Sequence, residues 1–219
     1  ALHRAGKKII LVNCSGSPIG LEPETQKCEA ILQAWYPGQQ GGKAVAEVLF
    51  GDYNPAGKLP VTFYRNVSQL PDFEDYNMTG RTYRYMQDVP LFPFGYGLSY
   101  TTFGYGKTVL DKNELTAGQS LKLTVPVTNT GKCNGEEVVQ VYLRKQGDAE
   151  GPIKTLRAFK RVSIPAGKTV NVEFDLKDKE LEWWDDQSNT VRVCPGNYDI
   201  MVGGSSKEED LQRTTIAIK

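Results

Sequence analysis

The serines near the amino end of the sequence are the first candidates for nucleophilic chemistry. Ser15 and Ser17 lie in the turn-forming stretch CSGSP. A serine nucleophile needs a general base beside it, and His3 is the one imidazole in the chain. We interpret His3 as a surface residue of a truncated helix. The sequence therefore predicts no serine-based catalytic centre.

Carboxylates are the other groups that could act as an acid, a base or a nucleophile. Two acidic clusters stand out, and Asp185 and Asp186 form a third group after two tryptophans. Asp and Glu side chains are mostly exposed unless they are paired. We therefore interpret these groups as solvated surface carboxylates and assign no catalytic residue among them. The two clusters are Glu22, Glu24 and Glu29, and Asp72, Glu74 and Asp75.

The cysteines do not have the spacing of a metal site. Cys14, Cys28, Cys133 and Cys194 form no Cys-x-x-Cys pair, and a single histidine is available to join them. A structural zinc site needs four such ligands, commonly in closely spaced pairs. We expect neither a metal ion nor any other cofactor.

Length and charge restrict the function classes further. A catalytic barrel of about 250 residues with an accessory domain does not fit in 219 residues. The 26 Lys and Arg balance the 26 Asp and Glu, so no net field attracts nucleic acid or anionic lipid. No apolar run reaches the roughly 18 to 20 residues of a membrane helix. We expect no nucleic acid and no membrane as partners, and a loop-rich chain dominated by strands.

Residues 1–65 predict part of a domain that mixes strands and helices. Short apolar runs are typical of buried parallel strands. Residues 41–51 carry apolar side chains on one helical face and end at a glycine, so they predict a helix. The three predicted strands and the helix would leave one edge and one face of their sheet uncovered, so we expect partner strands in sequence before Ala1. The predicted strands are residues 7–13, 29–35 and 59–63.

Residues 66–106 show neither a helical nor a strand period and are rich in Pro, Gly, Phe and Tyr. The aromatic side chains give this stretch too much apolar surface for a disordered segment. A connection this long without regular structure is usually functional or lies over a neighbour. We expect a linker that wraps over the adjoining domains.

Residues 107–219 alternate apolar and polar side chains in several short runs. Leu121 and Leu123, for example, interleave with Lys122 and Thr124, which is typical of half-buried antiparallel strands. Turn-forming stretches separate the runs. Such a series predicts an immunoglobulin-like or fibronectin type III-like sandwich. The predicted strands are residues 121–128, 138–144, 158–164, 170–177, 197–203 and 213–219.

Four blocks of this sequence follow one another in a recognisable order. They are AWYPGQQGGKAVAEVLFGDYNPAGKLPVTFY at 34–64, GRTYRY at 80–85, PFGYGLSYTTF at 93–103, and residues 127–143 with 156–168. Together they resemble the carboxyl-terminal region of glycoside hydrolase family 3, the β-glucosidase and β-xylosidase family. The resemblance implies a mainly β fold with an α/β part: a partial α/β sandwich segment at 1–65, a linker at 66–106 and a fibronectin type III-like β-sandwich at 107–219.

The resemblance also implies an activity. Family 3 enzymes are retaining, exo-acting β-glycosidases, which need two carboxyl groups about 5 to 5.5 Å apart. The family places its nucleophilic aspartate in an amino-terminal barrel and its acid/base glutamate upstream in the α/β sandwich, so both are expected before Ala1. We expect the chain alone to be inactive and to support a barrel that hydrolyses O-glycosyl bonds of plant-type oligosaccharides. The strings NCSGSPIG and GRTYRY look closer to the β-xylosidase branch.

Trp35 and Tyr36 are the first candidates for substrate binding in such an enzyme. They directly follow the strand-like AILQA, and ligands of open α/β sheets bind at the carboxyl ends of the strands. Arg81 and Tyr83 are the second candidates, because a guanidinium fork and a flat ring suit sugar hydroxyls and sugar faces. Packing between domains is the alternative interpretation of all four.

A different class of function also fits parts of the sequence. A non-catalytic β-sandwich module could bind polysaccharide or protein through Trp183 and Trp184, although paired tryptophans more often cover the flank of a sandwich. Residues 1–65 distinguish the two functions, because a binding module does not need part of a buried parallel sheet. We expect an oligosaccharide substrate, and a periplasmic or secreted location.

Overall fold

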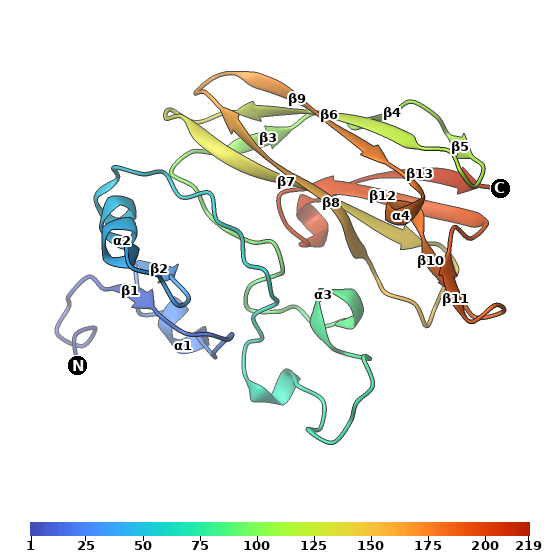
Figure 1. The fold of residues 1–219 in the computed structure, drawn as a ribbon. Coiled ribbons are helices and arrows are strands. Elements are labelled where there is room, and N and C mark those ends of the chain that lie inside the picture. Colours follow the sequence, from blue (N-terminus) through green and yellow to red (C-terminus); the bar gives the residue numbers. More distant parts are fainter.

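A long extended segment joins two folded parts in the computed structural model, which describes all 219 residues. Figure 1 shows the small amino-terminal part in blue and a larger β-sandwich in green to red. We call the connecting residues 52–102 the strap. The amino-terminal elements are β1 (Ile10–Asn13), α1 (Glu22–Thr25), β2 (Ala30–Gln33) and α2 (Gly41–Phe50), and the strap contains η1 (Val67–Gln69) and α3 (Thr82–Tyr85).

The amino-terminal part contains the parallel pair of strands that the sequence predicts. Ile10 of β1 lies opposite Ala30 of β2, and Asn13 lies opposite Gln33. The predicted helix is α2, which ends at Gly51 in the left-handed conformation (φ 83°) that favours glycine. No further strand pairs with either edge, so both strands are only partly buried.

The predicted third strand at residues 59–63 is wrong. These residues pair inside the strap and not with β1 or β2. Phe63 forms an isolated antiparallel bridge with Phe92, and its N–H donates to the Phe92 carbonyl at 2.9 Å. Pro60 has no N–H to donate, so the run cannot extend a regular ladder. The apolar run instead holds the two limbs of the strap together.

Two packed sheets form the β-sandwich, as the alternating runs predict. Its strands are β3 (Phe103–Tyr105), β4 (Val109–Leu110), β5 (Glu114–Leu115), β6 (Leu121–Asn129), β7 (Gly135–Lys145), β8 (Thr155–Ile164), β9 (Thr169–Leu176), β12 (Gly196–Gly203) and β13 (Gln212–Ile218). One sheet has the order β5-β13-β12-β7-β8, and the other joins β3, β6 and β4, with β9 also paired to β6. The remaining elements are α4 (Asp178–Leu181), η2 (Glu208–Asp210) and the hairpin of β10 (Trp183–Asp185) and β11 (Thr190–Arg192).

A core of 20 buried residues lies within the sandwich. In β6, Leu121 and Leu123 are buried whereas Lys122 is exposed, which confirms the predicted alternation. Trp183 and Cys194 also belong to this core. The longest helix, α2, has ten residues, and none of the helices could span a membrane.

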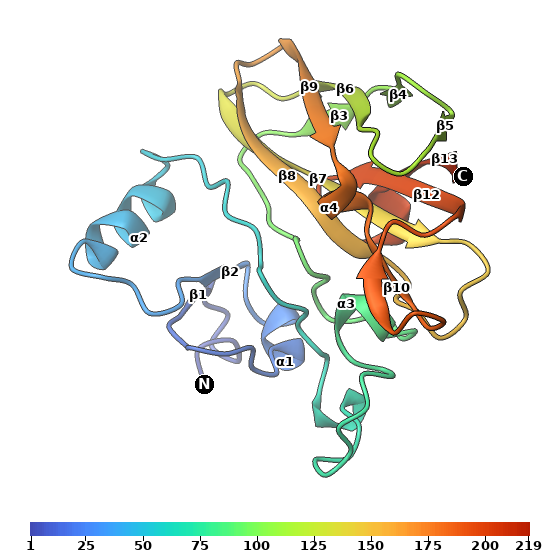
Figure 2. The ribbon, with the colours of Figure 1, turned by 45° about the vertical axis from the view of Figure 1, so that its right-hand side comes forward.

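The strap is fixed to the sandwich by a buried amide. Gln140 of β7 donates from Nε2 to the carbonyls of Gly95 (3.1 Å) and Gly204 (2.6 Å). Gly95 has φ 77°, and a Cβ there would lie 2.0 Å from Gln140 Oε1, so only glycine fits. The Tyr142 hydroxyl donates to the same Oε1 at 2.5 Å and orients the amide. Figure 2 shows the strap passing between the two folded parts.

Candidate functional site

The carboxyl ends of β1 and β2 meet at one edge, as their parallel pairing requires. Asn13 Nδ2 donates to Gln33 Oε1 at 2.6 Å and to Ser15 Oγ at 3.0 Å. Gln33 Nε2 donates to Ser15 Oγ at 3.2 Å. These three polar side chains fix the turns that follow the two strands, and the second of those turns carries Trp35.

Trp35 and Tyr36 lie at this edge in different environments. Trp35 has φ 56°, a left-handed conformation that residues other than glycine rarely adopt and that concentrates at functional sites. Its ring meets Phe63 of the strap edge-on at 6.1 Å. Tyr36 is 80% exposed, and its ring lies against Gly16, where a Cβ would come within 2.5 Å of it. Tyr36 thus presents a flat, accessible ring beside the polar edge.

Arg81 uses its guanidinium within the strap. Its Nε donates to the Asn77 carbonyl at 2.9 Å, and its Nη2 donates to the carbonyls of Asp72 and Asp75. Hydrogen bonds from Asn77 lower the pKa of the Asp75 carboxyl. The arginine fork therefore holds the loop at 72–77 in shape.

Tyr83 lies between the strap and the sandwich. Its ring stacks on Phe94 at 4.3 Å and meets Tyr142 edge-on at 5.9 Å. Its hydroxyl accepts a hydrogen bond from the Leu156 N–H at 3.1 Å. The four predicted residues thus occupy two places: Trp35 and Tyr36 lie at the edge of the parallel pair, and Arg81 and Tyr83 are engaged within and beneath the strap.

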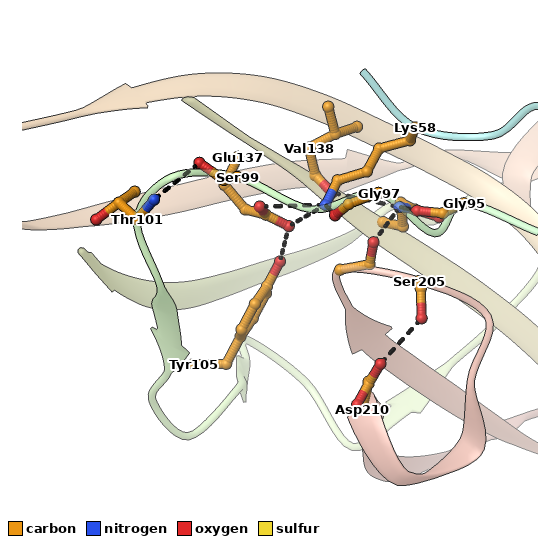
Figure 3. Close-up of polar contacts among 12 residues, drawn as sticks. Lys58, Gly95, Gly97, Ser99, Thr101, Tyr105, Glu137, Val138, Ser205 and Asp210 are labelled. Carbon is orange, nitrogen blue, oxygen red and sulfur yellow. Dashed lines mark hydrogen bonds and ion pairs between the residues drawn. The ribbon is translucent and has the colours of Figure 1, made fainter. Parts of the chain in front are cut away.

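Sequence reasoning missed a buried ion pair at the junction of the strap and the sandwich. Lys58 Nζ lies 3.3 Å from both carboxylate oxygens of Glu137 and donates to the Gly97 carbonyl at 3.1 Å (Figure 3). The Tyr105 hydroxyl donates to Glu137 Oε1 at 3.0 Å. Lys58 and Glu137 are 79 positions apart, so no local pattern links them.

The environment of Glu137 decides what that carboxylate can do. Its side chain is only 5% exposed, and burial raises its pKa, while Lys58 and Tyr105 act in the opposite direction. Burial and the Glu137 charge raise the pKa of the Tyr105 hydroxyl. A cavity of about 590 Å³ adjoins the cluster and reaches Asp210, which accepts a hydrogen bond from Ser205. All these groups already have partners, so the cluster is suited to attaching the strap to the sandwich.

The two tryptophans of β10 do not form a common platform. Trp183 is 2% exposed, and its Nε1 donates to Asp148 Oδ2 at 2.6 Å. Trp184 is half-exposed, and its Nε1 donates to Asp186 Oδ1 at 2.8 Å. Adjacent strand residues point to opposite faces, so one ring packs into the core and the other faces away from it. The structure brings together no group of three or more His, Cys, Asp or Glu that could hold a metal ion, and the four cysteines are unpaired.

Two family models match the chain. Residues 1–100 match the glycosyl hydrolase family 3 C-terminal domain. Residues 137–206 match a fibronectin type III-like domain. The two matches occur in the order of the two folded parts.

Relatives match over nearly the whole chain. A protein named xylan 1,4-beta-xylosidase from Xylanibacter ruminicola is 56% identical over 218 residues, which cover all of this chain and 25% of that relative. A protein named periplasmic beta-glucosidase from Salmonella typhimurium is 38% identical over 94% of this chain and 28% of the relative. The chain thus spans roughly a quarter of the length of these relatives.

A solved structure has the same fold. The β-glucosidase from Erythrobacter marinus superposes with a TM-score of 0.86 and 40% identity, over all of this chain and 29% of that one. The two family matches, the relatives and this likeness agree with one another. The chain belongs to glycoside hydrolase family 3, in which it corresponds to the carboxyl-terminal portion of the enzymes.

Proposed function

We propose that this chain is the supporting portion of a retaining, exo-acting β-glycosidase that hydrolyses O-glycosyl bonds of plant-type oligosaccharides. The observation that carries the proposal is the 56% identity to a protein named xylan 1,4-beta-xylosidase along the full chain. The corresponding value for the relative named β-glucosidase is 38%, which supports xylose over glucose as the released sugar. The nucleophile and the acid/base belong to the barrel and the upstream sandwich of the intact enzyme.

The three segments of the chain have different parts in this function. Residues 1–65 contribute strands β1 and β2 to a larger α/β sandwich, and the open edges of this pair are available to further strands. Residues 66–106 wrap the junction. Residues 107–219 form the fibronectin type III-like domain, which holds residues 66–106 through the hydrogen bond of Gln140 to Gly95 and residues 1–65 through the ion pair of Glu137 with Lys58. By holding both segments, the fibronectin type III-like domain fixes the position of the edge formed by the carboxyl ends of β1 and β2, where the substrate binds.

We further propose that Trp35 and Tyr36 contact the oligosaccharide. They lie at the carboxyl ends of parallel strands, the edge at which α/β sheets bind ligands. The exposed ring of Tyr36 is suited to stacking on a sugar face. For Arg81 and Tyr83 we propose the supporting role, since both already bond within the strap or to the sandwich. The relative named periplasmic supports a periplasmic or secreted location.

A chimeric enzyme tests the proposal. Replacing the matching quarter of the Xylanibacter xylosidase by this chain should give a folded enzyme that cleaves aryl β-xylosides faster than aryl β-glucosides. The chain alone should show no turnover above a heat-denatured control on either substrate. A chimera that is folded by circular dichroism and gel filtration yet cleaves neither substrate would contradict the proposal, as would turnover by the isolated chain.

In the same chimera, Tyr36→Ala tests the substrate edge. We expect it to raise KM for xylo-oligosaccharides by about fivefold, since one stacking contact contributes on the order of 1 kcal/mol. Val191→Ala, an exposed apolar residue of the β10–β11 hairpin, is the matched control and should leave KM unchanged. Equal kinetics for the two variants would remove Tyr36 from the site.

A further inference from the structure

Two arginines without carboxylate partners lie where α3 of the strap meets the sandwich. Arg84 belongs to α3 and Arg157 to β8. The Ile153 N–H donates to the Arg84 carbonyl at 2.6 Å, which holds α3 against the segment that leads into β8. The neighbouring Tyr83 hydroxyl accepts from the Leu156 N–H at 3.1 Å. Figures 1 and 2 both show α3 near the beginning of β8.

The hydrogen bonding of these two guanidinium groups is incomplete. The Arg84 side chain has no hydrogen-bond partner, and its Nε is fully buried. Arg157 donates from Nη2 to the Glu182 carbonyl at 2.5 Å, while its Nε is also buried without a partner. Buried donors without acceptors are uncommon in folded proteins and call for an explanation.

Four other arginines of the chain show the usual arrangement. Each of four guanidinium groups forms an ion pair with a carboxylate of the same chain. The pairs are Arg65 with Glu22, Arg161 with Glu136, Arg192 with Asp185, and Arg213 with Glu208 and Asp199. Arg84 and Arg157 form no such pair, although both are more than half shielded from solvent. Arg4, Arg81 and Arg144 form no ion pair either, so Arg84 and Arg157 are distinguished by the combination of a missing ion pair and a buried Nε that has no acceptor.

Aromatic rings hold the two cations in place. The Arg84 guanidinium lies 5.7 Å from the centroid of Tyr85, and that of Arg157 lies 5.6 Å from the centroid of Trp183. Trp183 is itself fixed by its hydrogen bond to Asp148. A ring that covers the face of a guanidinium leaves its edge, with the N–H donors, directed elsewhere. The two rings thus limit how each guanidinium can turn.

The local balance of charge favours an anion. Burial lowers the pKa of Arg157, and the positive charge of Arg84 lowers it further, so the two cations are close enough to repel each other. The Glu182 carboxylate acts in the opposite direction but forms no ion pair with Arg157. Asp148, the other acidic group that touches this cluster, bonds Trp183. An incoming carboxylate would relieve the repulsion and supply acceptors to the terminal Nη groups, since both Nε atoms are buried.

We propose that Arg84 and Arg157 form a binding site for a carboxylate group, apart from the edge that carries Trp35 and Tyr36. Arginine forks bind carboxylates through two parallel N–H···O bonds, and two forks can share one carboxylate. The carboxylate belongs either to an acidic sugar or to an acidic side chain of another polypeptide segment. In both cases the chemistry that the site recognises is the same.

Titration of the full chain with small carboxylates tests the proposal. The probes are sodium D-glucuronate and sodium acetate at constant ionic strength, with D-glucose as the neutral control, and the readout is the side-chain Nε–H signals of the two arginines by NMR. We expect saturable shifts with both carboxylates and none with glucose. Tighter binding of glucuronate than of acetate assigns the site to an acidic sugar, and equal binding assigns it to a carboxylate side chain.

Substitutions make the test specific. Arg84→Gln should raise the half-saturating carboxylate concentration about tenfold or more, because a charge-assisted pair is lost. Arg157→Lys keeps the charge but loses the planar fork, so it should weaken binding less. Arg192→Gln, which alters an arginine that already has Asp185 as a partner, is the matched control and should bind as the unaltered chain does. Absence of saturable shifts in the unaltered chain, or equal affinity in folded Arg84→Gln, would overturn the proposal.

Discussion

The sandwich and the amino-terminal part differ most in how much of each is buried. The sandwich has a core of 20 buried residues, whereas Leu21 and Gly41 are the only buried residues among positions 1–50. Both parts form regular strands, so strand formation does not explain the difference. Burial of apolar surface is the main term that stabilises a fold. Regular strands can therefore belong to a domain whose own core stabilises it or to one that depends on its neighbours for burial.

The largest expected effect lies in the sandwich core. Leu143→Ala in β7 removes a side chain that is 1% exposed and should lower the free energy of unfolding by about 4 kcal/mol, because it loses burial and leaves a cavity. Leu49→Ala in α2, where the side chain is 38% exposed, should lower it by about 1 kcal/mol or less. Urea unfolding followed by circular dichroism measures both. Equal losses of unfolding free energy would show that the two parts are packed equally tightly.

The next effect concerns the attachment of the strap. Lys58→Met leaves the Glu137 carboxylate buried without its cation and should cost about 3 kcal/mol, since an uncompensated buried charge is strongly destabilising. The double variant Lys58→Met with Glu137→Gln should recover much of this loss. Urea unfolding of the four proteins in a double-mutant cycle gives the coupling energy. Additive effects of the two substitutions would mean that the ion pair does not join the strap to the sandwich.

The smallest effect is a change in pH dependence. Burial raises the pKa of Glu137 above its usual 4.5, so the folded state holds this proton more tightly than the unfolded state. The resulting stabilisation is complete when the pH is below 4.5, and it is lost as the pH rises through the pKa that Glu137 has in the folded state. Glu137→Gln should remove this component, so the difference in unfolding free energy between the two proteins should change as pH rises above the usual value of 4.5. A constant difference would show that the carboxyl does not titrate differently on folding.

The sandwich was predictable because its signals are local. Alternation in β6 and β9 directly reflects one buried and one solvated face, and each run is long enough to show the period. The strands β3, β4 and β5 have only two or three residues each, too few to show any period, so the sequence did not indicate them. The prediction at residues 59–63 failed because an apolar run does not reveal its partner, which here is Phe92.

The candidate site was predictable only where topology places residues together. Parallel pairing of β1 and β2 brings Trp35 to the same edge as Asn13, and the sequence patterns of the two strands were sufficient for that inference. The pairing of Lys58 with Glu137 depends on how the strap lies on β7, which no pattern in either segment specifies. Arg84 and Arg157 likewise meet only through packing of α3 against β8.

The position of the strap contacts on β7 has a consequence for the order of folding. Glu137 and Gln140, which bind the strap, lie on a strand that pairs with β8 on one side and β12 on the other. During synthesis the strap leaves the ribosome before any of these strands, and its docking surface is complete only when residues 196–203 have joined the sheet. The later-made domain therefore acts as the template on which the earlier segment settles. Until β7 is in place, Tyr83 of the strap lacks the ring of Tyr142 against which it packs.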